Sequence, residues 1–269
     1  MAGTLASIEG SVSQTTPVGP RRVIDIDGAF NFRDIGGGVT VDGQPLATGR
    51  MYRSASLDEL TDRGLETVER LGIRTVIDLR SQGEIDRNGR FPYERVPVRW
   101  VHVASPMGPP TDRDDPRARA FLDHPDPMSL LFKMMVSYGN GLFVDALKVM
   151  AEADSGPLVF HCTSGKDRTG LLAALLQLIV GVELEEVLAD FEHSAEAVKA
   201  SGHNMTARFP GIAGMPPERV ERLHAADRAW VLGALEEIGG LARLDAWLDS
   251  IGVDVGMRAS LRRHFLSLA

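Results

Sequence analysis

The sequence contains a single cysteine, Cys162, in 269 residues. One cysteine excludes an internal disulfide and favours a reducing compartment. The first residues also lack the basic and apolar segments of a secretory signal peptide. We therefore expect a cytoplasmic protein, while export by a non-classical route stays compatible with the sequence.

Long apolar runs and an excess of positive charge are also missing. The longest apolar run, Leu171–Val180, is too short to span a bilayer, which predicts no integral membrane segment. The 37 Asp and Glu residues outnumber the 29 Lys and Arg residues, giving a net charge of −8. We therefore expect no nucleic-acid partner, and an anionic substrate must be attracted by a local basic pocket. No His, Cys, Asp and Glu cluster has metal-ligand spacing, so we expect no metal and no other cofactor. The sequence predicts no particular oligomeric state.

Hydrophobic residues make up 43% of the sequence, which is enough for one sizeable core. Residues 1–20 are small, polar and aperiodic and are predicted to be a disordered tail. Residues 21–269 are predicted to form a single α/β domain with a mostly parallel, four- or five-stranded sheet and helices on both faces. The segment that follows residue 105 is rich in Pro, Asp and Arg, and we expect a lid insertion over residues 106–140.

The stretch Leu158–Thr169, LVFHCTSGKDRT, is the centre of the sequence. Its apolar start predicts a buried strand, and the apolar run after Thr169 predicts a helix. The loop between them therefore ends at a helix N-terminus. Backbone N–H groups gather in such a turn, and the helix dipole adds partial positive charge. The sequence thus predicts an anion site between Cys162 and Arg168.

The side chains of this loop suggest nucleophilic chemistry. A cysteine thiol, whose usual pKa is about 8.5, ionises far more readily at a helix N-terminus or beside cations. Cys162 is therefore the candidate nucleophile, and Arg168 can hold two phosphate oxygens in its planar fork. Asp167 is unusual in an anion site, and it fits either a proton donor to the leaving oxygen or a tether for a neighbouring Arg. The remaining candidate contacts are Thr163, Ser164 and Gly165, the cation of Lys166, and the Thr169 hydroxyl facing the sulfur.

The string HCTSGKDRTG resembles the phosphate-binding loop of the cysteine-dependent phosphatases, with the pattern H-C-x5-R-[ST]-G. Its GKDR form is most similar to bacterial tyrosine phosphatases that also act on phosphoinositides. The string NFRDIGG, which begins at Asn31, is similar to one near the start of the same family. The resemblance implies hydrolysis of a phosphorylated protein or a phosphoinositide through a cysteinyl-phosphate. It also implies that Asp167 is the general acid and that Lys166 helps to admit lipid phosphates.

Further charged residues are candidates for support or for acid catalysis. Gly72–Arg80 is predicted to be a central parallel strand, and its end resembles the DLRS string beside the family's loop. Asp78 is a second acid candidate or a structural partner of Arg80, and Arg80 is a pocket or support cation. Arg33 and Asp34 are predicted to form a buried supporting pair. Asp112, Asp114 and Asp115 are further acid candidates in the expected lid.

Two other functions use a similar loop. A binding module would hold a phosphate without hydrolysing it, although every residue that the chemistry needs is present here. An arsenate reductase or sulfurtransferase is disfavoured, because the chain has no second thiol to resolve an intermediate. The sequence therefore favours a phosphatase over both alternatives.

Overall fold

The computed structural model of the chain describes residues 22–106, 116–200 and 214–266. The predicted tail at residues 1–20 lies outside these ranges, as do three of the acid candidates, Asp112, Asp114 and Asp115. None of the helices in the described ranges combines the length and the apolar character that crossing a bilayer requires.

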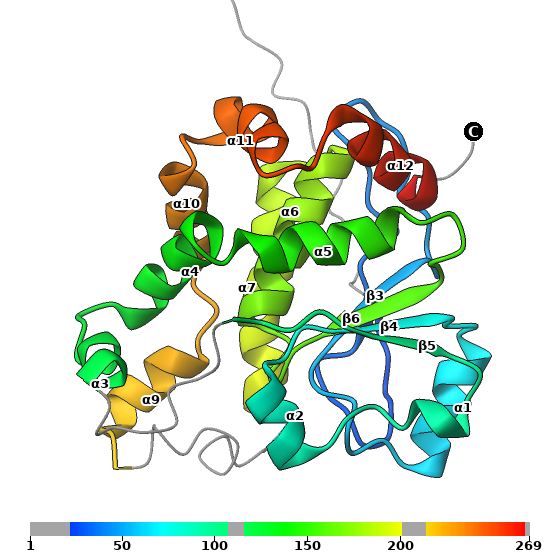
Figure 1. The fold of residues 1–269 in the computed structure, drawn as a ribbon, viewed down its shortest axis with the longest axis horizontal. Coiled ribbons are helices and arrows are strands. Elements are labelled where there is room, and N and C mark those ends of the chain that lie inside the picture. The colour runs from blue at the N-terminus through cyan, green and yellow to red at the C-terminus, as the bar shows by residue number, and fades with distance from the viewer. Residues whose placement is uncertain (1–21, 107–115, 201–213, 267–269) are drawn as a thin grey trace, which may run out of the picture.

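A six-stranded sheet forms the centre of the fold (Figure 1). Its order is β1 (Arg22–Val23), β2 (Arg33–Asp34), β3 (Met51–Ser54), β6 (Leu158–His161), β4 (Thr75–Asp78) and β5 (Arg99–His102). The last four strands in this order are parallel, whereas β1 and β2 are antiparallel to their neighbours. The predicted α/β fold with a mostly parallel sheet is confirmed. The strand number exceeds four or five because β1 and β2 have two residues each, too few to show a period.

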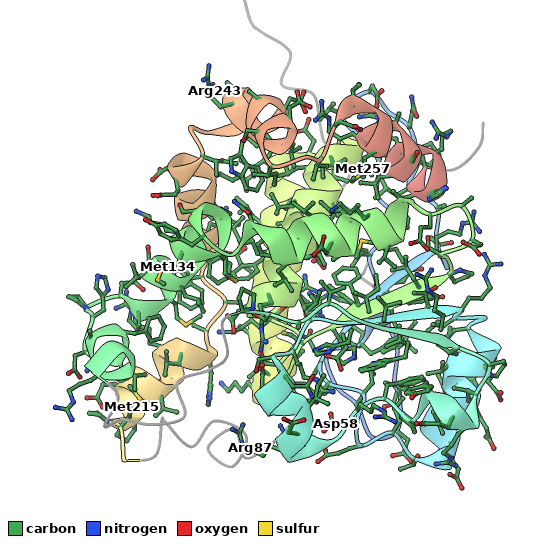
Figure 2. The ribbon with its side chains drawn as sticks, viewed as in Figure 1. Asp58, Arg87, Met134, Met215, Arg243 and Met257 are labelled. Atoms are coloured by element: carbon green, nitrogen blue, oxygen red, sulfur yellow. The ribbon has the colours of Figure 1, made fainter. Side chains whose placement is uncertain are left out.

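Helices cover both faces of the sheet, as predicted. Helices α5 (Asn140–Ala151), α6 (Asp167–Val180) and α12 (Val255–Phe265) lie on the upper side in Figure 1, and α1 (Asp62–Arg70) lies below it. Side chains fill the space on both sides (Figure 2). The other elements are α2 (Gln82–Asn88), α3 (Pro116–Leu122), α4 (Pro127–Ser137), α7 (Leu184–Ala200), α9 (Pro217–His224), α10 (Arg228–Glu237), α11 (Leu244–Ser250) and two 3-10 turns (Tyr93–Arg95, Leu241–Arg243).

The end of β6 lies at the middle of the sheet. All four residues of β6 are buried, as expected for a strand covered on both faces. His161, the last residue of β6, pairs in register with Ser54 of β3 and with Asp78 of β4. The carboxyl ends of three parallel strands therefore meet where the chain continues into Cys162, the usual place for a ligand in this class of fold.

Candidate active site

The predicted loop connects β6 directly to the N-terminus of α6. Cys162 follows the strand, and the helix begins at Asp167. Gly165 has a φ of +65°, and a Cβ atom built there would lie 2.4 Å from the Ser54 carbonyl oxygen. Only glycine suits this position, because the turn needs the left-handed conformation and close approach to β3. The loop is thereby pressed against the end of β3.

The carbonyl oxygens of the loop accept hydrogen bonds from groups that surround it. Asn31 Nδ2 donates to the carbonyls of Ser164 (3.1 Å) and Gly165 (3.0 Å), and Arg53 Nη2 donates to that of Gly165 (2.8 Å). The remaining bonds are Leu79 N to His161 O (2.8 Å), His161 Nδ1 with Cys162 O (3.3 Å), Ser56 N to Thr163 O (3.1 Å) and Gly170 N to Lys166 O (2.7 Å). Each carbonyl from His161 to Lys166 is thus satisfied.

The N–H groups of the same loop are left for a ligand. Within the described part of the chain, no group accepts a hydrogen bond from the backbone N–H of any residue from Thr163 to Lys166. Buried backbone donors normally have partners, so a run of four without one is typical of an anion site. The N-terminus of α6 adds the positive end of its dipole. Cys162 lies at this loop with only 1% of its surface exposed.

Arg168 is held by a buried carboxylate that the sequence did not indicate. Its two terminal nitrogens donate to the two oxygens of Glu84, each over 2.7 Å, and Nη1 also reaches the Leu79 carbonyl. Burial by itself would raise the pKa of Glu84, but the charge and hydrogen bonds of Arg168, together with the hydroxyl of Thr163, lower that pKa to about 2. The pair therefore stays ionised at neutral pH, and the guanidinium plane is fixed.

A local signal for Glu84 was present in the sequence. Ser81 and Glu84 have the S-x-x-E spacing of a capping box, and Glu84 accepts hydrogen bonds from the backbone N–H and the hydroxyl of Ser81 at the start of α2. The motif predicts the start of a helix directly after the β4 strand end. It does not predict that the same carboxylate binds Arg168, since 84 residues separate the two.

The predicted Arg33–Asp34 pair is wrong. Successive side chains of a strand point to opposite faces, so the two residues have different partners. Arg33 Nε donates to Asp190 Oδ1 of α7 over 2.9 Å, whereas the Asp34 oxygens accept from the backbone N–H groups of Gly36 and Gly49. Arg33 nevertheless supports the loop, because its Nη1 donates to the side-chain oxygen of Asn31.

The geometry gives Asp78 and Arg80 a structural role. Both are fully buried, and Arg80 donates from Nε (2.9 Å) and Nη2 (2.7 Å) to the two Asp78 oxygens. Arg80 Nη1 lies 3.4 Å from Asp58, which is labelled below the sheet in Figure 2. Burial would raise the pKa of Asp78, but His161 and Arg80 lower it to about 2. Asp78 therefore has no proton to donate at neutral pH, and its oxygens are held by Arg80.

Lys166 and Asp167, the last residue of the loop and the first of α6, form an ion pair with Nζ and Oδ1 3.1 Å apart. The Lys166 ammonium also donates to the carbonyls of Leu223 (2.5 Å) and Ala225 (2.7 Å) and lies 5.0 Å from the centre of the Trp230 ring. Its side chain is 3% exposed, and the ammonium is bound by the C-terminal end of α9 and the residue after it. Asp167 remains 23% exposed at the first turn of α6.

The other predicted contacts are Thr163, Ser164, Gly165 and Thr169. The Thr163 hydroxyl donates to Glu84 over 2.5 Å, which leaves its backbone N–H as its contact for an anion. Ser164 and Gly165 likewise offer their backbone N–H groups. The Thr169 hydroxyl is buried and has no hydrogen-bond partner in the described ranges, consistent with a hydroxyl that faces the sulfur.

Comparison with known proteins identifies a family model and one relative that match nearly the whole chain. The model of a family described as the tyrosine phosphatase family matches residues 24–267. A Cupriavidus necator protein, provisionally named a tyrosine-protein phosphatase, is 31% identical over 257 residues, covering 92% of this chain and 89% of the relative.

Two further relatives carry related names. A tyrosine-protein phosphatase of Nostoc commune is 29% identical over 215 residues, covering 75% of this chain and 69% of the relative. The triple specificity protein phosphatase PtpB of Mycobacterium tuberculosis is 30% identical over 199 residues, covering 65% and 70%. All three relatives are named as protein phosphatases, which agrees with the phosphate chemistry expected of the loop.

Proposed function

This chain belongs to the tyrosine phosphatase family, and we propose that it hydrolyses phosphotyrosine through a phosphate ester of Cys162. The observation that carries the proposal is the loop whose carbonyls all take part in hydrogen bonds while four consecutive N–H groups have no acceptor in the described ranges. A dianionic phosphate fits these donors, with Arg168 at one end and the Cys162 sulfur at the other.

The proposed reaction has two steps. The Cys162 thiolate attacks phosphorus, an S–P bond forms, and the P–O bond to the tyrosine breaks while Asp167 gives its proton to the leaving oxygen. Water then attacks the phosphocysteine, Asp167 takes up a proton from that water, and the S–P bond breaks to release phosphate and the thiolate. The loop N–H groups and Arg168 stabilise the charge on the phosphoryl oxygens in both steps.

Phosphotyrosine is the favoured substrate because of the depth of the nucleophile. Cys162 is 1% exposed, so a substrate must carry its phosphate well below the surface. The tyrosine ring is a rigid arm of sufficient length, whereas the side chain of phosphoserine is short. The carbonyl-bound position of Lys166 also keeps a second cation away from the entrance.

Hydrolysis of phosphoinositides is a second proposed activity, based on the GKDR sequence of the loop. A second phosphate of such a lipid needs a further cation, and Lys166 is the nearest one in the loop. Its ammonium must first leave the carbonyls of Leu223 and Ala225. We therefore propose phosphoinositides as the slower substrates.

A comparison of substrates tests both activities. We expect kcat/KM for a phosphotyrosine peptide to exceed that for the same peptide with phosphoserine by about a hundredfold, with a soluble phosphoinositide between them. Released phosphate is measured under identical conditions. A phosphotyrosine peptide that binds but stays intact for hours would instead identify a binding module and contradict the proposal.

The role of Asp167 is tested with Asp167→Asn. Tyrosine is a poor leaving group with a pKa of about 10, whereas para-nitrophenol leaves readily without a proton. We expect the variant to lose about a hundredfold in kcat on phosphotyrosine, much less on para-nitrophenyl phosphate, and the basic limb of its pH profile on phosphotyrosine. Asp145→Asn, at an exposed carboxylate paired with Lys148, is the matched control and should retain the wild-type profile. Equal losses on both substrates would show that Asp167 is not the general acid.

A further inference from the structure

Two buried arginines behind the loop share one carboxylate. Arg33 Nε and Arg53 Nη1 donate to the two oxygens of Asp190, over 2.9 and 2.5 Å. Ser194 Oγ accepts from both arginines, and the Asp190 carbonyl accepts from Arg33. All four side chains are at least 98% buried. Among the described residues, Asp190 is the carboxylate that pairs with either arginine, so the group has one excess positive charge.

The excess positive charge of the two arginines destabilises the fold when nothing compensates it. An uncompensated buried charge is costly, and proteins normally pair or neutralise it. An anion bound next to the arginines would offset the cost. The loop next to Arg53 is built for two such anions, the Cys162 thiolate and the substrate phosphate. The excess charge therefore has a functional explanation at this site.

Arg53 connects this charge to the nucleophile. It pairs in register with Phe160 of β6, two residues before Cys162, and its Nη2 donates to the Gly165 carbonyl within the loop. Burial and Arg33 lower the pKa of Arg53 to about 10, whereas Asp190 and the Cys162 thiolate raise it. Arg53 and the sulfur thus interact electrostatically across a dry interior, where charges are weakly screened.

The other charged groups around Cys162 contribute no net positive charge. Burial lowers the pKa of His161, which disfavours a positive charge on that ring at neutral pH, and its Nε2 lies 3.6 Å from Asp78. The charged groups that face the loop from the other elements are the ion pairs Arg168–Glu84 and Lys166–Asp167, and Arg80 with both Asp78 and Asp58. His224 of α9 lies near Lys166 and Asp167, and burial together with Lys166 lowers its pKa. In the enzyme without substrate, in which Lys166 and Asp167 form an ion pair, the first two pairs are neutral and the third group is negative. The excess positive charge thus lies on the side of β2, β3 and α7.

We propose that Arg33, Arg53 and Asp190 are positioning residues that set the ionisation of Cys162 by balancing two positive charges against one negative charge. The proposal rests on the proposed role of Cys162 as nucleophile, but its consequence is visible on the thiol without any substrate. The two arginines stabilise the thiolate, and Asp190 limits that effect while holding both guanidinium groups in place. Loss of an arginine and loss of the carboxylate must therefore act in opposite directions.

The test is the pH profile of alkylation by iodoacetamide, read by intact mass. Because Cys162 is the single cysteine, every adduct reports on it. We expect Arg53→Gln to raise the midpoint of the profile by roughly one pH unit and Asp190→Asn to lower it by a similar amount. Arg53→Lys, which keeps the charge, should restore a midpoint near that of the wild type.

The control is Ser194→Ala, which removes hydrogen bonds to both arginines without changing any charge. We expect it to lower the melting temperature while the alkylation midpoint stays unchanged. If Arg53→Gln does not fold, Arg33→Gln removes the same charge and leaves the Arg53–Gly165 bond intact. Midpoints that move in the same direction for the arginine and Asp190 variants, or that do not move, overturn the proposal. A wild-type enzyme that fails to hydrolyse phosphotyrosine but shows the opposite shifts would refute the proposed function alone.

Discussion

Cys162→Ser is expected to reduce phosphotyrosine hydrolysis by at least about a thousandfold, because a serine hydroxyl stays protonated where a thiol ionises. The loop itself should persist in this variant, since its carbonyls are held by Asn31, Arg53 and the ends of β3 and β4 rather than by the sulfur. We therefore expect a phosphotyrosine peptide to bind Cys162→Ser about as tightly as its KM for the wild type indicates.

Two measurements on the same variant separate chemistry from folding. Initial rates give the loss of turnover, and titration with the phosphotyrosine peptide gives the retained affinity. A melting temperature close to that of the wild type shows that the fold is intact. Activity above a few per cent of the wild type, with contamination excluded by an independent preparation, would contradict the role of Cys162 as nucleophile.

The second large effect is expected for Arg168→Lys. Lysine keeps the positive charge but lacks the planar fork that binds Glu84 and that, in the proposed mechanism, also holds the phosphate oxygens. We expect kcat to fall by a factor between about a hundred and a thousand, as when a donor to the developing charge is removed. Glu84→Gln leaves the guanidinium in place but weakens its alignment, and we expect a smaller loss, of about tenfold.

A matched substitution on the surface controls for the exchange of arginine for lysine. Arg99 is half exposed and pairs with Glu152 far from the loop, so Arg99→Lys should keep full activity. A mild effect of Arg168→Lys, similar to that of Arg99→Lys, would show that a point charge suffices and that the aligned fork has no catalytic role.

The parts of the site that could be predicted from the sequence are those encoded locally. The run Leu158–Thr169 carries its strand, its loop and its helix start in consecutive residues, so its structure follows from periodicity and the position of Gly165. The buried strand that ends in Asp78 was predicted for the same reason. The resemblance to a phosphatase family added the chemistry, and the match over residues 24–267 confirmed the family.

The parts that could not be predicted depend on contacts between distant residues. Arg33 was assigned to its neighbour Asp34, but its partner Asp190 lies 157 residues away on α7. The sequence likewise suggested Lys166 as a cation for the substrate, and no local pattern predicts that the carbonyls of Leu223 and Ala225 bind it. Pairings of this kind are decided by how the helices pack on the sheet, and adjacency in the sequence is a poor guide to them.

The most direct test of the proposed mechanism is to trap the phosphoryl group on the enzyme. Hydrolysis of a phosphotyrosine peptide is stopped with acid within the first turnover, and the digested protein is examined by mass spectrometry. We expect one phosphoryl group on the peptide that contains Cys162, formed at the rate at which the dephosphorylated substrate peptide is released. Release of the dephosphorylated peptide in a burst while Cys162 stays unmodified, or a phosphoryl group on any other residue, would contradict the proposed mechanism.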